Sequence, residues 1–211
     1  MGPSSLGSVF DPSSQHGDVD ARIVATLERL SQVFRVRLRE EARQRNLSSI
    51  QAQFLIYLLH HTVELRRVSH LAREFDLTQA TVSDAVASLE SKGFLQREQW
   101  PDDRRVVTLR LTSDGEKLAK RLSDWADPIR EHLQRFPPGE RETVMRFLLE
   151  LTGSLQRSGL ITVARMCLTC RFFRRDVRHG EASPHHCALL DVPLGGHNLR
   201  VDCPEHEAAA G

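Results

Sequence analysis

The segment that decides the fold is residues 76–112, DLTQATVSDAVASLESKGFLQREQWPDDRRVVTLRLT. It first breaks one short helical pattern and then starts another, for which Thr78 is a favourable N-cap. The apolar spacing predicts a helix over residues 79–91. Gly93 follows, at the position where a left-handed residue commonly ends a helix. Together with the short apolar pattern at residues 69–74, this segment predicts a helix-turn-helix.

Two stretches of alternating apolar and polar residues come directly after this helix pair. They cover Phe94–Glu98 and Val106–Leu111 and predict two antiparallel strands. The turn between them, Trp100–Arg104, contains proline and aspartate, which favour tight turns. A helix-turn-helix followed by a charged β-hairpin is the order of elements in a winged-helix DNA-binding domain.

Further helices are expected on both sides of this segment, because apolar residues recur there at spacings of three and four. The expected helices cover residues 18–38, 48–59, 113–134 and 140–157. The last of them places Val144, Phe147 and Leu151 on one apolar stripe, which no later helix is expected to cover. A stripe left uncovered in this way favours a homodimer.

The expected fold class is therefore mostly α: a winged helix-turn-helix domain with a β-hairpin wing, long N- and C-terminal dimerisation helices and an irregular cysteine-rich extension. Residues 1–17 are rich in Ser, Gly and Pro, which predicts a disordered tail. The winged-helix and dimerisation domain is expected over residues 18–160. The extension is expected over residues 161–207, followed by a disordered end at residues 208–211.

The composition adds few constraints. The 211 residues carry a formal net charge of +1, and between Glu64 and Arg110 the basic and acidic residues balance. A DNA-binding protein with this balance must place its cations individually, since it has no general positive field. The first residues lack a positive region and an apolar core, so we expect no signal peptide. No apolar run is long enough to span a bilayer, and we expect a cytoplasmic location without a membrane partner.

The N-terminal end of the expected recognition helix carries the first candidate DNA-binding residues, Gln79, Thr81 and Ser83. A recognition helix enters the major groove by this end. Glutamine pairs bidentately with adenine, and hydroxyl groups bind phosphates or base edges. The alternative is that these are only polar residues on a face exposed to solvent.

The hairpin turn carries the second group of candidates. Arg104 lies at its tip, where a long cation reaches a minor groove or a backbone phosphate. Asp103 and Arg105 flank it two residues apart, and an ion pair between them would fix the shape of the turn. The alternative is a solvated turn with an incidental ion pair.

Residues 18–158 resemble the MarR family of winged-helix transcription regulators. The resemblance rests on VSHLAREFDLTQATVSDAVASLESKGFL and on DDRRVVTLRLTSDGEKL. The second stretch is similar to the Asp-x-Arg wing signature of the family and to the Leu-Thr pair that opens its next helix. The resemblance implies a homodimer, held by its terminal helices, that binds a pseudo-palindromic operator in double-stranded DNA. It also implies a role for each candidate: Gln79, Thr81 and Ser83 read the major groove, Arg104 probes the minor groove, and Asp103 and Arg105 brace the wing.

All four cysteines lie in the extension, at positions 167, 170, 187 and 203. Typical members of the family end before this segment, so the resemblance says nothing about it. In an intracellular protein such clustering favours metal ligation or redox chemistry over structural disulfides. Three interpretations remain open: free thiols, a structural zinc site and an iron–sulfur cluster.

An iron–sulfur cluster is the cofactor we expect. Cys167 and Cys170 form a Cys-x-x-Cys pair, while Cys187 and Cys203 are single, which suits a cluster larger than one ion. Zinc modules commonly show two such pairs, although zinc accepts four thiolates. His185, His186 or His206 could replace a thiolate. A basic group beside the pair either contacts DNA, balances the charge of a centre or faces solvent: Arg171, Arg174, Arg175 and Arg178.

Three functions are therefore compared. The first is a DNA-binding transcription regulator, expected to be a repressor, whose cysteine centre is an iron–sulfur cluster that senses redox or iron status. The second is the same regulator with a structural zinc site and control by a small molecule. The third is a thiol oxidoreductase that uses Cys167 and Cys170. No βαβ pattern surrounds this pair, and no catalytic triad or phosphate loop is present, so we expect no enzyme.

Overall fold

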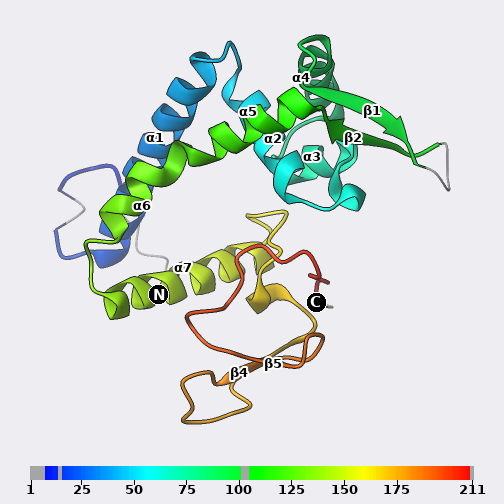
Figure 1. Cartoon of the computed structure of the whole chain (residues 1–211). Coiled ribbons are helices and arrows are strands. Elements are labelled where there is room, and N and C mark those ends of the chain that lie inside the picture. The colour runs from blue at the N-terminus through cyan, green and yellow to red at the C-terminus, as the bar shows by residue number, and fades with distance from the viewer. Residues whose placement is uncertain (1–7, 14–15, 101–104, 210–211) are drawn as a thin grey trace.

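The computed structural model describes residues 8–13, 16–100 and 105–209. Helices dominate these ranges, with a two-stranded and a three-stranded sheet (Figure 1). The α-helices are α1 (Val19–Arg43), α2 (Ser49–His60), α3 (Val68–Glu74), α4 (Gln79–Ser91), α5 (Ser113–Ser123), α6 (Asp127–Leu133) and α7 (Pro138–Arg157). The strands are β1 (Leu95–Gln99), β2 (Val107–Leu111), β3 (Phe173–Arg174), β4 (His185–Cys187) and β5 (Val192–Leu194). Short 3₁₀ helices are η1 (Val63–Leu65), η2 (Asp124–Ala126) and η3 (Cys167–Thr169). The mostly helical winged-helix class is confirmed.

Side-chain caps fix where the main helices begin. The Asp18 carboxylate accepts the first free N–H groups of α1. Ser48 and Gln51 form a reciprocal capping box at the start of α2. The Thr78 hydroxyl accepts the Thr81 N–H at 3.1 Å, which confirms Thr78 as the N-cap of α4. These caps satisfy backbone donors that would otherwise lack a partner at each helix start.

The core lies between α2, α3, α4, α5 and the hairpin β1–β2, which together form the winged-helix lobe. Phe54, Leu58, Val86 and Leu89 are fully buried there. The Phe54 ring lies 5.2 Å from the ring of Phe75, which follows α3. Burial of each such side chain stabilises the fold by about 1.5–3 kcal/mol, so the apolar faces of these helices hold the lobe together.

The wing is the antiparallel pair β1–β2, whose register places Leu95 opposite Leu111. The Leu109 N–H donates to the Arg66 carbonyl at 2.7 Å, so the loop after η1 pairs with the other side of β2. Gly93 takes a φ of +75°, as expected for the residue that ends α4.

The segment 113–134 differs from the single helix expected there. It forms α5, the 3₁₀ turn η2 and then α6. Pro128 lies in the first turn of α6. Its ring excludes an N–H and would clash with the carbonyl four residues earlier, so a continuous α-helix cannot pass through this point.

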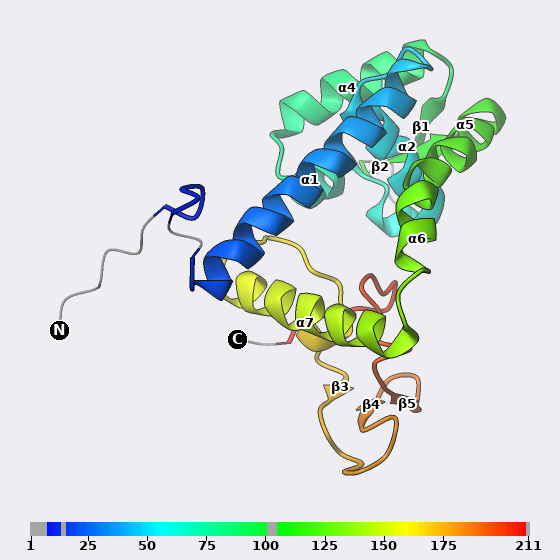
Figure 2. The ribbon, with the colours of Figure 1, turned by 90° about the vertical axis from the view of Figure 1, so that its left-hand side faces the viewer.

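The extension is also more regular than expected. Strands β3, β4 and β5 form a small antiparallel sheet, with Phe173 opposite Cys187 and His185 opposite Leu194. Figure 2 shows this sheet below α7, away from the winged-helix lobe. No helix within the described ranges has the length and hydropathy needed to cross a bilayer.

Candidate nucleic-acid interface and cysteine pocket

The N-terminal end of α4 is open to solvent. Gln79 and Thr81 are exposed there and Ser83 is half-buried, while Val82 and Val86 face the core. The Thr81 hydroxyl lies 2.9 Å from that of Thr78, so the cap holds it close to the helix end. The three residues predicted to read the major groove therefore lie at one accessible helix end.

The wing carries charges that are mostly paired at its base. Arg110 pairs with Glu98 across the hairpin, and the Arg67 guanidinium lies 5.9 Å from the ring centre of Trp100. Arg105 is exposed in the turn that precedes β2. The predicted residues Asp103 and Arg104 lie outside the described residues.

A second surface consists of apolar residues on α1, α6 and α7, on the side of the molecule opposite the wing (Figure 1). On α7, Val144 and Phe147 are 55% and 47% exposed. A monomer that leaves this many large apolar side chains in water is unusual. The members on the three helices and the loop after α6 are Val19, Val24, Leu30, Val33, Phe34, Val36, Leu133, Phe136, Val144, Phe147 and Leu148.

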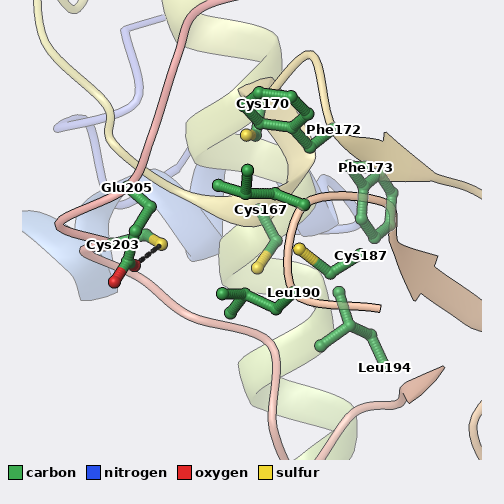
Figure 3. Close-up of a pocket in the computed structure, with 10 residues that line it drawn as sticks. Cys167, Cys170, Phe172, Phe173, Cys187, Leu190, Leu194, Cys203 and Glu205 are labelled. Carbon is green, nitrogen blue, oxygen red and sulfur yellow. Dashed lines mark hydrogen bonds between the residues drawn. The ribbon is translucent and has the colours of Figure 1, made fainter. Parts of the chain in front are cut away.

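The four cysteines line one pocket, although they come from three separate places in the extension. Cys167 begins η3 and Cys170 follows it, Cys187 ends β4, and Cys203 lies in the last loop. Apolar side chains surround them: Phe172, Phe173, Leu189, Leu190 and Leu194. In Figure 3 the sulfurs of Cys167 and Cys187 point toward one another, so the fold brings together residues twenty positions apart.

Hydrogen bonds to sulfur come from a residue that the sequence did not single out, Arg200. Its backbone N–H donates to Cys167 Sγ at 3.2 Å, and its Nη1 donates to Cys203 Sγ at 3.4 Å. The Cys203 thiol in turn donates to the Glu205 carboxylate at 3.3 Å (Figure 3). Burial raises the pKa of the Cys167 thiol, and burial likewise raises the pKa of Cys203, so both are protonated at neutral pH.

The chemistry of the donor set suits a metal centre, but the side chains are not closed around one. Four thiols in an apolar setting, with two N–H···S contacts, are the ligands and outer hydrogen bonds typical of zinc and iron–sulfur sites. Within residues 8–13, 16–100 and 105–209, however, no three His, Cys, Asp or Glu side chains are grouped so as to hold an ion. A cavity of about 20 Å³ lies between the cysteines. Ligation therefore requires the thiols to rotate inward.

The candidate histidines have other partners. His185 lies 3.3 Å from Asp176, His186 lies 3.2 Å from Asp191, and His206 Nε2 lies 3.0 Å from the Thr169 hydroxyl. Among the described residues that line the cysteine pocket there is no histidine.

The basic group beside the Cys-x-x-Cys pair is engaged within the protein. Arg171 pairs with Glu207 and Arg178 with Glu181, while Arg174 donates to a backbone carbonyl. Arg175 forms two hydrogen bonds to Glu150 of α7, at 2.8 and 3.3 Å. These contacts favour a structural role for the group over DNA contact.

The comparisons with known proteins concern the winged-helix part of the chain. A model described as the MarR family matches residues 51–107, which run from α2 into the wing. The chain therefore resembles the MarR family over these residues. It is 30% identical over 96 residues to the transcriptional regulator AdcR of Streptococcus pneumoniae, covering 42% of this chain and 63% of AdcR. It is 33% identical over 106 residues to YhbI of Bacillus subtilis, an uncharacterised regulator of helix-turn-helix type, covering 50% and 66%. The chain thus matches less than two thirds of either relative.

Solved structures extend the likeness to the whole of a neighbouring chain. MepR of S. aureus in its DNA-binding conformation superposes with a TM-score of 0.56 at 23% identity, covering 64% of this chain and 98% of MepR. A MarR regulator from Methanosarcina mazei superposes with a TM-score of 0.53 at 21% identity, covering 65% and 96%. These neighbours show the winged-helix fold of the part of the chain that they cover.

Proposed function

We propose that this protein is a DNA-binding transcription regulator that acts as a homodimer. The observation that carries the proposal is the open N-terminal end of α4 beside the β1–β2 wing on one lobe. A helix end presented in this way fits the major groove, and a hairpin beside it reaches the flanking backbone or minor groove. The MarR family match over the same residues supports this assignment.

In this proposal Gln79 and Thr81 contact base edges, and Ser83 contacts the backbone or a base. The wing supplies Arg104 to the minor groove, with Asp103 and Arg105 shaping the turn. The apolar surface on α1, α6 and α7 pairs two copies of the chain. A two-fold dimer presents two recognition helices, so the operator is pseudo-palindromic with half-sites about 10 bp apart.

Selection from a random duplex library, followed by fluorescence anisotropy, tests DNA binding. The wild-type dimer should enrich a pseudo-palindrome. Gln79→Ala should weaken binding to it by about 10-fold and relax preference at one base pair per half-site, since a bidentate contact contributes about 1–3 kcal/mol. Gln134→Ala removes an exposed glutamine at the end of α6 and serves as the matched control. Enrichment of no sequence would overturn the proposal.

We further propose that the four cysteines hold an iron–sulfur cluster through which the regulator responds to redox or iron status. Three separated attachment points, an apolar lining and N–H···S contacts from Arg200 support this centre. When bound, such a centre supplies a reversible one-electron or oxygen-labile group. The chain's own residues orient the thiols and exclude water from them. Burial raises the pKa of the Cys167 thiol, unlike the lowered pKa of a reactive nucleophile, which speaks against an oxidoreductase.

A structural zinc site is the second candidate, favoured by the cavity of about 20 Å³, which has room for one water-sized group. In that case the signal would be a small molecule. A cavity of about 690 Å³ between α1, α2 and η2 offers a place for it, lined in part by Phe34, Ile50 and Trp125.

Single substitutions test which residues hold the centre. Replacing any of the four cysteines by serine should lower the bound metal per chain and leave the winged-helix lobe folded, as judged by circular dichroism. His206→Gln should retain the metal if all ligands are thiolates. Retention of full metal content by every serine variant would exclude the cysteine centre.

A further inference from the structure

The extension touches both the winged-helix lobe and the helix expected to form the dimer. On α7, Glu150 accepts the Arg175 guanidinium, and Gly153 leaves room for the Leu168 side chain. On the lobe, residues from both ends of the extension meet the ends of α2 and α3. Figure 1 shows the start of the extension, in yellow, reaching toward α3. The extension therefore connects the winged-helix lobe to α7.

Arg165 is the centre of the contact with the lobe. Its Nη1 donates to the Glu74 carboxylate at 2.8 Å, and its Nε donates to Asp202 at 2.9 Å. The other oxygen of Asp202 lies 2.7 Å from His61 Nε2, at the end of α2. The Arg165 side chain is only 14% exposed, and its guanidinium lies 5.7 Å from the ring centre of Tyr57. Hydrogen bonds between charged groups, as in this cluster, are about twice as strong as those between neutral groups.

The same arginine is bonded to the cysteine pocket through the backbone. The Cys203 N–H donates to the Arg165 carbonyl at 2.8 Å, and Asp202 immediately precedes Cys203. The Cys203 thiol lines the pocket with the other three cysteines. A shift of the Cys203 backbone therefore acts directly on Arg165 and Asp202, the two residues that hold the extension on the lobe.

On the lobe side, the Arg165–Glu74 contact lies next to the turn that precedes α4. Glu74 is the last residue of α3, and only four residues separate it from the first residue of α4. Asp76, within this turn, takes a φ of +50°, a left-handed conformation in which aspartate is enriched. The Thr162 hydroxyl also donates to the Arg73 carbonyl at 3.4 Å. Two residues of the extension thus bond to the end of α3, directly before the recognition helix.

We propose that Arg165 is a positioning residue that couples the state of the four-cysteine pocket to the orientation of α4. This inference rests on the proposed function and adds the route by which the pocket controls DNA binding. Inward movement of Cys203 pulls on the Arg165 carbonyl and Asp202, and the guanidinium passes the displacement to Glu74. The two states of the pocket then differ in operator affinity, and the Arg165–Glu74 pair carries that difference.

The test compares operator affinity of the full-length dimer with its native centre and after removal of the centre by a chelator. The wild type should show an affinity ratio of about fivefold or more between the two states. Arg165→Gln should bind the same amount of metal per chain while its ratio falls to near one. Glu74→Gln changes only the lobe side of the pair and should have the same effect. Arg171→Gln, which removes a pair with Glu207 inside the extension, should keep the wild-type ratio.

Amide hydrogen exchange gives a second readout that does not depend on DNA. Arg165→Gln should speed exchange at residues 73–77 and at Cys203, whereas Arg171→Gln should not. The coupling would be overturned if the wild type bound its operator equally well with and without the centre. It would also be overturned if Arg165→Gln and Glu74→Gln both kept the wild-type affinity ratio. Failure of the proposed function is read separately, as absent metal or absent operator binding in the wild type.

Discussion

Gly115 packs against the carbonyl oxygen of Phe94 so closely that a Cβ atom at position 115 would lie 1.8 Å from that oxygen. The same carbonyl accepts the Thr112 N–H at 3.1 Å, so it cannot move away without breaking the start of α5. Gly115→Ala should therefore destabilise the winged-helix lobe by about 3 kcal/mol. Urea unfolding measures the loss. Gly139→Ala, in the first turn of α7 with open space around it, is the control and should be neutral or slightly stabilising. Equal midpoints for Gly115→Ala and wild type would contradict this packing.

If the apolar surface on α1, α6 and α7 forms the dimer, a charged residue placed in it should change the mass of the assembly. Phe147 lies on α7 and is 47% exposed in the single chain. Phe147→Glu should convert the dimer to a monomer at micromolar concentration, because it places a charge in an apolar contact. Sedimentation velocity gives the mass. Leu160→Glu, at a residue 75% exposed beyond the end of α7, should remain a dimer. A dimeric Phe147→Glu variant would place the interface elsewhere.

The wing predicts a change in salt dependence. If Arg104 contacts a phosphate or the minor groove, Arg104→Ala should weaken operator binding and reduce the slope of log affinity against log salt by about one per wing. Fluorescence anisotropy titrations at salt concentrations from about 50 to 200 mM measure this slope. A slope identical to that of the wild type would show that Arg104 does not touch the DNA.

The contact between the extension and α7 predicts a pH dependence. Hydrogen bonds from Arg175 hold the pKa of Glu150 below its ordinary value. A lowered carboxyl pKa adds stability that is complete above the ordinary value of about 4.3 and is lost as the pH falls through the folded-state pKa. Glu150→Gln should therefore lower the melting temperature at pH 7, and this effect should disappear as the pH falls below the folded-state pKa of Glu150. The pair is exposed, so the expected effect is small, about 0.5 kcal/mol. A pH-independent difference would contradict this assignment.

The sequence predicted the winged-helix lobe well because its signals are local. Thr78 caps α4 through its own neighbour Thr81, and Gly93 ends the helix by its own backbone conformation. Apolar spacing predicted the buried face of the same helix. Pro128 is the sequence signal for the break in the helix after residue 123. The apolar spacing continues on both sides of this proline and therefore predicted one continuous helix.

The contacts of the extension could not be predicted, because they join residues far apart in the chain. Arg165 and Glu74 are separated by 91 positions, and Arg165 belongs to no motif that the sequence shows. Arg200 donates to two cysteine sulfurs, yet its only signal was a position three residues before Cys203. The cysteine pattern predicted a shared site, whereas the fold alone determines which sulfurs and donors meet.

The most direct measurement is an absorption spectrum with iron, zinc and acid-labile sulfide analysis on protein purified without oxygen. We predict a brown protein with visible charge-transfer absorption, containing iron and sulfide that are lost in Cys203→Ser. Colourless protein whose four thiols react fully with a thiol reagent, and which contains neither iron nor zinc, would contradict a thiolate-held centre.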